Sequence, residues 1–89
     1  MATPAQVAND MAAHAAYWEK RDRRIERLCR DAARVIRLYL SGERVDRRTW
    51  AGLHMRLLSC ARDESSVKGY PDFTRARLTL EALRQRCGP

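Results

Sequence analysis

The residue types that usually carry catalysis are few in this sequence and lie far apart. Its two histidines, His14 and His54, have no Ser or Cys nucleophile and no acidic residue at a recognisable motif spacing. Asp63 and Glu64 are adjacent, whereas a general acid and a general base must face each other across a substrate. No glycine-rich loop that would cradle a phosphate is present. We therefore expect no catalytic residues and no enzymatic activity.

The three cysteines, Cys29, Cys60 and Cys87, are also widely separated. They form no Cys-x-x-Cys pair and no cluster with histidine, so neither a zinc site nor a disulfide framework is predicted. A free cysteine packs like a small hydrophobic residue. We expect reduced, mostly buried thiols in a cytoplasmic protein that binds no metal and no cofactor.

Anion binding is the chemistry that the sequence favours. Sixteen of the 18 basic residues are arginine, and the formal net charge is +7. Five arginines are spaced four, three, four and three residues apart, so on a helix they fall within about 80° of one another and extend over roughly 21 Å. The planar guanidinium group makes paired hydrogen bonds with phosphate or carboxylate, which lysine does not. We call this set the arginine ridge: Arg23, Arg27, Arg30, Arg34 and Arg37.

The sequence leaves three interpretations of the arginine ridge. It is a solvated face that keeps a small protein soluble, it contacts the acidic surface of a host protein, or it contacts nucleic acid. For nucleic acid, the sequence predicts no helix-turn-helix with a short turn, no zinc finger and no aromatic-bearing sheet. Without such a motif, nucleic acid would be bound only through its phosphate backbone, with an affinity that falls steeply as the salt concentration rises. Nucleic acid is the alternative partner.

The elements that position the ridge are predicted to be helices of one small domain, residues 1–89. The chain has 89 residues, of which 45% are hydrophobic, and this composition suits a folded domain with one modest core. No apolar run approaches the 18 or more residues that would span a bilayer, and no secretory signal is recognised. No strand pattern of useful length is found. We expect an all-α protein with no membrane partner.

The first predicted helix is long and covers about residues 4–41. Thr3 is its expected N-cap, Pro4 occupies the first position, and Gln6 completes a capping box. Ser41 and Gly42 are typical of a helix end. Between these signals, apolar residues recur every seven positions at Met11, Trp18, Ile25, Ala32 and Tyr39. The polar run 19–24 is the place where this helix would bend or break.

Two shorter helices are predicted at about residues 46–62 and 73–87. Asp46 caps the first of them, and its apolar face includes Trp50, Leu53 and Leu57. Residues 63–72, which include serines, Gly69 and Pro71, are predicted to form a loop. The expected fold is thus a three-helix arrangement with one long N-terminal helix and two shorter helices.

These lengths leave the start of the long helix uncovered. The long helix would measure roughly 55 Å, whereas the two shorter helices would measure roughly 25 and 21 Å. We therefore predict an arm that docks on a second copy or on another protein, most simply in a homodimer. The alternative is a disordered leader that ends near Asp10, with Trp18 inside the domain. The arm carries Val7, Met11, His14, Tyr17 and Trp18.

These features together predict a small, non-catalytic interaction protein. Arginine and alanine both have GC-rich codons, which suggests a GC-rich bacterial or bacteriophage genome. A compact chain rich in these residues and without a catalytic motif resembles in style the small accessory proteins of phages and mobile elements. We expect it to bind, and to inhibit or modulate, a host protein through the arginine ridge and the exposed aromatic pair Tyr17 and Trp18. The alternative is a basic regulator that contacts the phosphate backbone of nucleic acid through the same ridge.

Overall fold

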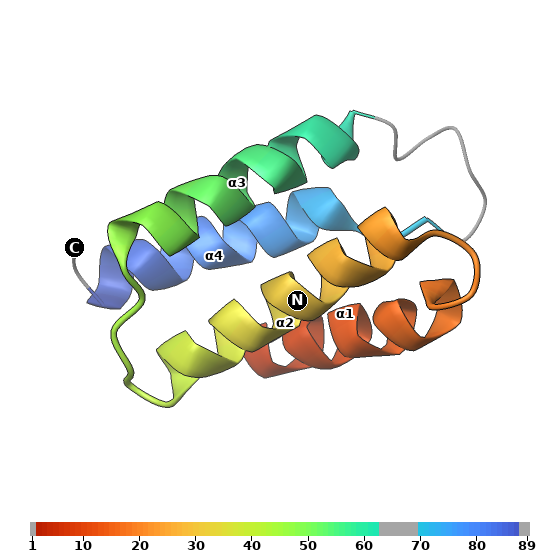
Figure 1. Ribbon diagram of the computed structural model, residues 1–89. Helices are drawn as coiled ribbons and strands as arrows, with labels where there is room; N and C mark the ends of the chain where they lie inside the picture. The colour runs from red at the N-terminus through yellow and green to blue at the C-terminus, as the bar shows by residue number, and fades with distance from the viewer. Residues whose placement is uncertain (1, 63–69, 88–89) are drawn as a thin grey trace.

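The computed structural model is an antiparallel bundle of four helices in which each helix runs opposite to the one before it (Figure 1). It describes residues 2–62 and 70–87. The helices are α1 (Pro4–Trp18), α2 (Arg23–Leu40), α3 (Arg47–Ala61) and α4 (Phe73–Cys87). The all-α prediction is confirmed. The prediction of three helices with one long N-terminal helix is wrong, because the segment 4–41 forms two helices that fold against each other.

The predicted long helix breaks between Trp18 and Arg23. The carbonyl oxygen of Trp18 accepts the N–H groups of Arg21 and Asp22 at 3.0 Å each, which closes a tight turn. Asp22 then has an extended backbone, with φ −156° and ψ 109°, and caps α2: its Oδ1 accepts from the N–H of Arg24 at 2.9 Å and of Ile25 at 3.4 Å. The break therefore falls within the polar run that the sequence marked as the weak point.

The other helix ends follow the local signals in the sequence. Thr3 and Gln6 form the predicted capping box, with Gln6 N–H donating to Thr3 Oγ1 at 3.2 Å and Thr3 N–H donating to Gln6 Oε1 at 2.8 Å. Gly42 has φ 80° just after α2, a conformation that glycine adopts without strain. Asp46 Oδ1 accepts the N–H of Thr49 at 2.6 Å and starts α3. Of the predicted loop, residues 63–69 lie outside the described residues.

Every helix contributes apolar side chains to one shared core. Val7, Met11 and Ala15 from α1 meet one face of α2, while α3 supplies only Leu53 and Leu57. Fully burying a large apolar side chain stabilises a fold by about 1.5–3 kcal/mol. The largest fully buried side chains from the helices are Met11, Leu28, Ile36, Leu57, Phe73 and Leu80.

The prediction of an uncovered N-terminal arm is wrong. Val7 and Met11 are each 2% exposed and Trp18 is 8% exposed, because α1 folds back along α2 and also touches α4. His14 is half-buried, and only Tyr17 of the predicted arm is largely exposed, at 48%. The alternative is right that Trp18 lies inside the domain, but α1 already begins at Pro4, so a leader ending near Asp10 is wrong. The homodimer was predicted because a second copy would cover this arm, and the chain's own helices already cover Val7, Met11 and Trp18.

None of the helices described is both long enough and apolar enough to cross a membrane.

Candidate binding surface

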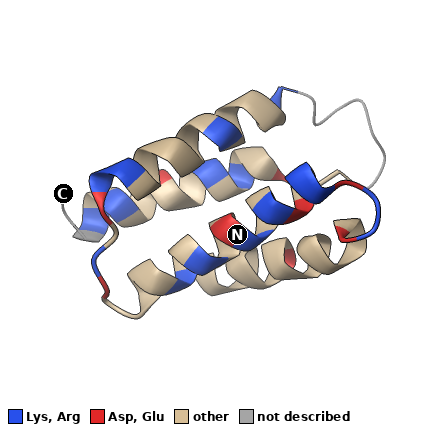
Figure 2. Cartoon of the chain, in the orientation of Figure 1, with Lys and Arg blue, Asp and Glu red and all other residues tan. Residues whose placement is uncertain are grey.

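The arginine ridge lies on the outer face of α2. Leu28, Ala32, Val35, Ile36 and Tyr39 turn the opposite face of α2 into the core, and this burial fixes which way the arginines point. All five ridge arginines are exposed, as their helical spacing predicts. In Figure 2, basic positions mark α2 and α3, whereas α1 contains no Lys or Arg at all.

Most of the charge on the ridge is not neutralised. Arg30 Nε pairs with Glu26 Oε2 at 2.8 Å, and Arg37 Nη2 donates to Asn9 Oδ1 at 3.1 Å. Across residues 2–62 and 70–87, the other ridge arginines have no hydrogen bond and no ion pair. An exposed ion pair between residues four apart contributes only about 0.3–0.5 kcal/mol, so the Glu26 pair costs little to exchange for another carboxylate. The arginines without a partner are Arg23, Arg27 and Arg34.

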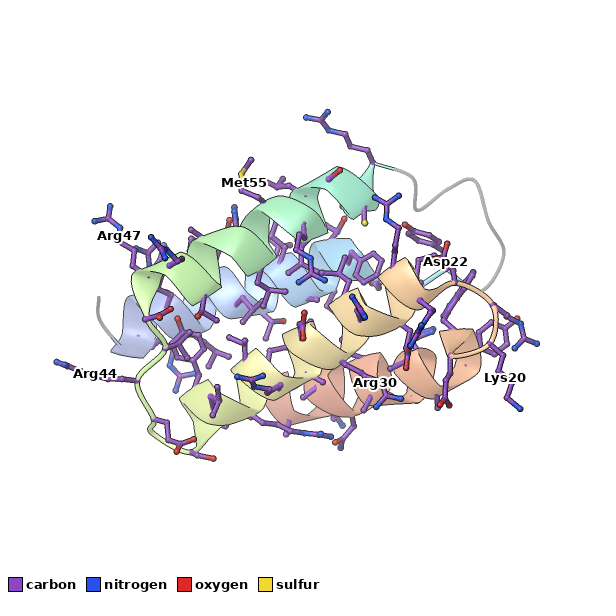
Figure 3. All side chains as sticks on the ribbon, in the orientation of Figure 1. Lys20, Asp22, Arg30, Arg44, Arg47 and Met55 are labelled. Carbon is purple, nitrogen blue, oxygen red and sulfur yellow. The ribbon has the colours of Figure 1, made fainter. Side chains whose placement is uncertain are left out.

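A groove of about 570 Å³ runs beside the ridge, between α1 and α2. Its floor consists of small apolar side chains, and its α2 rim carries three ridge arginines. Figure 3 shows Arg30 at the seam between the two helices. We call this hollow the α1–α2 groove: Ala12, Ala15, Ala16, Arg30, Ala33, Arg34, Arg37, Leu38 and Ser41.

On its other side, the ridge borders two smaller hollows between α2 and α3. One has a volume of about 310 Å³ and is lined by Arg34 and Arg48; the other, of about 230 Å³, is lined by Arg24 and Arg27. Arg56 lines both hollows and pairs through Nη1 with Asp31 Oδ2 at 2.7 Å. The two α2–α3 hollows are together lined by five arginines and by Asp31, whereas the α1–α2 groove is lined by three arginines and no acidic residue.

The aromatic pair predicted to contact a partner is divided by the fold. Trp18 is buried and packs edge-to-face on Tyr17, with ring centroids 5.6 Å apart, and on Tyr70 at 6.2 Å. The premise that Trp18 is exposed to a partner is therefore wrong. Tyr17 stays exposed, and the guanidinium group of Arg21 lies 4.1 Å from the centre of its ring. Val7 and Met11 are likewise core residues and are not available as an arm.

A polar cluster that was not predicted from the sequence lies between α3 and α4. His54 Nε2 lies 2.7 Å from Glu81 Oε1, and Arg77 Nη1 donates to the same oxygen at 3.1 Å. The His54 ring stacks on Trp50 with ring centroids 4.6 Å apart, and the guanidinium group of Arg84 lies 4.1 Å from the centre of the Trp50 ring. The contact between His54 and Glu81 was not predicted because these residues are 27 positions apart in the sequence. The one local signal was the placement of Trp50 and His54 one helical turn apart.

The cluster links α3 to α4 through hydrogen bonds and ring contacts. The hydrogen bond from His54, helped by the charge of Arg77, lowers the pKa of Glu81 below its usual value, although partial desolvation opposes this shift. Trp50 stacks on His54, and Arg77 contacts Glu81. Because His54 and Trp50 belong to α3 whereas Arg77 and Glu81 belong to α4, these contacts join the two helices.

The cysteine environments do not favour reactive chemistry either. Cys29 is fully buried on α2, as predicted, and burial raises the pKa of its thiol to about 12, with a smaller contribution from nearby Cys60. Cys60 is half-buried, and neither of these thiols is in a disulfide. Among residues 2–62 and 70–87, no three His, Cys, Asp or Glu side chains are grouped so as to hold a metal ion.

Comparisons with models of protein families, with curated proteins and with solved structures found no match to this chain.

Proposed function

We propose that this chain is a small, non-catalytic interaction protein that binds an acidic surface of a partner protein through the arginine ridge. The bound chain would act by covering that surface and so inhibiting or modulating the partner. The binding element is the ridge. Trp18, Val7 and Met11 are not contact residues, because the protein's own core buries them.

The observation that carries the proposal is that the ridge arginines are exposed and most of them have no partner among the described residues. Five guanidinium groups lie in a row on a helix whose other face is locked in the core, and three of them have no partner among the described residues. Because α2 is already folded, little backbone order has to be gained when carboxylates bind. Lysine would serve solubility equally well, whereas paired hydrogen bonds with carboxylates need the guanidinium group.

The apolar floor of the α1–α2 groove favours a protein over nucleic acid. Ala12, Ala16 and Ala33 offer nothing to a phosphate backbone, whereas a protein partner can bury apolar side chains against them. Nucleic acid is retained as the second candidate because of the α2–α3 side, where hydroxyl groups and arginines line the hollows. The lining there includes Arg24, Arg27, Arg34, Arg48, Thr49, Arg56 and Ser59.

The test is capture of partners by charge-reversed variants. The ridge variant changes Arg27, Arg30 and Arg34 to Glu. A control with the same change in net charge alters Arg44, Arg47 and Arg62, which are exposed and belong to neither the ridge nor the hollows. Figure 3 shows Arg44 and Arg47 projecting into solvent near the α2–α3 connection.

Each chain is immobilised and exposed to lysate from the organism that carries the gene, with and without nuclease. The proposal predicts a protein that the wild type and the control retain after nuclease treatment and that the ridge variant loses. Equal capture by the ridge variant would contradict the proposal. Loss of all capture after nuclease, together with a gel shift of duplex DNA that weakens at higher salt, would favour the second candidate.

A further inference from the structure

The α1–α2 groove has the length of a short helix. It is lined from Arg30 to Ser41 along α2, which is about 16 Å or three helical turns. The two helices that form it run side by side in opposite directions (Figure 1). A third helix laid along this seam would contact both α1 and α2 at once. A partner helix of about 11 residues would span this length.

The small side chains of the floor allow a backbone to approach closely. Packed helices sit 8–10 Å apart depending on the side chains between them, and alanine gives the short end of this range. Ala12 and Ala16 on α1 face Ala33 on α2 across the groove. The groove therefore has room for the larger apolar side chains of a partner, arranged at i, i+3, i+4 and i+7 on one helix face.

The charge of the groove is confined to one edge. Arg30, Arg34 and Arg37 all belong to α2, whereas the lining from α1 consists only of alanine. Acidic side chains of a bound helix would therefore have to lie along the edge that faces α2. The arginine spacing of four and then three residues matches acidic residues at i, i+4 and i+7 on a parallel helix, or at i, i+3 and i+7 on an antiparallel one.

Existing contacts hold two of these arginines in place at the rim. Arg37 donates to Asn9 of α1 at 3.1 Å, across the end of the groove, and Arg30 pairs with Glu26. Each guanidinium group has five N–H donors, so both keep donors for another carboxylate. Arg34, between them, has no partner within the described part of the chain and lines the groove.

We propose that the α1–α2 groove binds an acidic amphipathic helix of a partner protein, with its apolar face on the alanine floor and its acidic edge against Arg30, Arg34 and Arg37. This inference rests on the proposed function and specifies the partner segment. A second copy of this chain does not supply such a segment, because α2, α3 and α4 are basic and α1 carries only one acidic residue, Asp10.

The experiment uses three fluorescent probes and two tryptophan variants of the full chain. The first probe is a 14-residue helical peptide with leucines on one face and glutamates at i, i+4 and i+7 along one edge. The second has glutamine in place of these glutamates, and the third is a 20-base-pair DNA duplex. Ala16→Trp fills the groove without changing charge, and Ala13→Trp makes the same change at an exposed position of α1 outside the groove.

The proposal predicts that wild type and Ala13→Trp bind the glutamate peptide alike and that Ala16→Trp binds it at least about tenfold more weakly. The glutamine peptide should also bind at least about tenfold more weakly to the wild type. Circular dichroism of each variant checks that the fold is intact, and Ala16→Ser, which leaves the groove open, should bind like the wild type.

Equal binding of the glutamate peptide by Ala16→Trp and Ala13→Trp would overturn the groove as its site. No binding of this peptide even at low salt would overturn an acidic helix as the occupant. A DNA duplex that displaces the peptide and is itself excluded by Ala16→Trp would assign the groove to nucleic acid instead. The proposed function is tested separately, because it fails only if the charge-reversed ridge variant captures the partner as well as the wild type does.

Discussion

At the scale of single residues, the sequence predicted what depends on local spacing and missed what depends on distant partners. The ridge arginines are exposed because their four-three spacing follows the helical period and the apolar residues between them are buried. The contact between His54 and Glu81 joins two helices, and no local pattern marks Glu81 as the partner. The same is true of the α1–α2 groove, whose alanines come together only because α1 folds back.

The lowered pKa of Glu81 leads to a prediction about pH and stability. Because this pKa is lower in the folded chain than the usual 4.5, folding is stabilised while Glu81 is ionised, and this contribution is lost as pH falls through the folded-state pKa. Glu81→Gln keeps a hydrogen-bonding side chain but removes the ionisable group. We expect wild type to exceed Glu81→Gln in free energy of unfolding near pH 6, with a difference that shrinks below pH 4.5.

Urea denaturation of both chains between pH 3 and pH 7 measures this difference. Arg77 contacts the same carboxylate, so Arg77→Gln should reduce the pH dependence without abolishing it. A difference between wild type and Glu81→Gln that stays constant over the whole range would show that the ionised carboxylate is not what stabilises the α3–α4 contact.

At the scale of the elements, helix ends were predictable but the turn between α1 and α2 was not. Thr3, Asp46 and the Ser41–Gly42 end each act within a few residues, and the structure places all three as predicted. Residues 19–24 have ordinary helix-forming tendencies, so propensity alone favours a continuous helix. The turn forms because folding back buries the apolar face of α1, and this gain depends on the whole bundle.

The turn gives a prediction about the N-cap of α2. Asp22 Oδ1 accepts two backbone N–H groups at the start of α2, so Asp22→Ala should lower the free energy of unfolding by about 0.5–2 kcal/mol. Asp22→Asn keeps an oxygen that can accept these hydrogen bonds, so it should lower the free energy of unfolding much less. Chemical denaturation measures both variants. Equal losses for Ala and Asn would mean that the carboxylate charge, rather than the cap geometry, stabilises this end.

At the scale of the whole molecule, the fold combines one helix without basic residues and three basic helices. Helix α1 has no Lys or Arg and supplies apolar side chains to the core, while α2, α3 and α4 carry exposed arginines (Figure 2). A partner for α1 was expected because residues 4–41 were predicted to form one helix that two shorter helices could not cover. With α1 as a separate element, the bundle itself buries Val7, Met11 and Trp18, and the arginine ridge faces outward.

The role of α1 in the core can be measured directly. Met11 is 2% exposed and packs in the shared core, so Met11→Ala should lower the free energy of unfolding by about 2–5 kcal/mol. Asp10→Ala, at the exposed neighbouring position, is the control and should change stability little. If Met11→Ala were as stable as this control, α1 would not be part of the cooperative core.

The central claim is that the arginine ridge of α2 binds an acidic protein partner. The most direct test is the dissociation constant of the partner retained in the capture experiment, measured for wild type, for the ridge variant with Arg27, Arg30 and Arg34 changed to Glu, and for the control with Arg44, Arg47 and Arg62 changed to Glu. We predict that the ridge variant binds at least about tenfold more weakly than the control, a loss of about 1.4 kcal/mol or more. Dissociation constants for the two variants within twofold of each other would contradict the account.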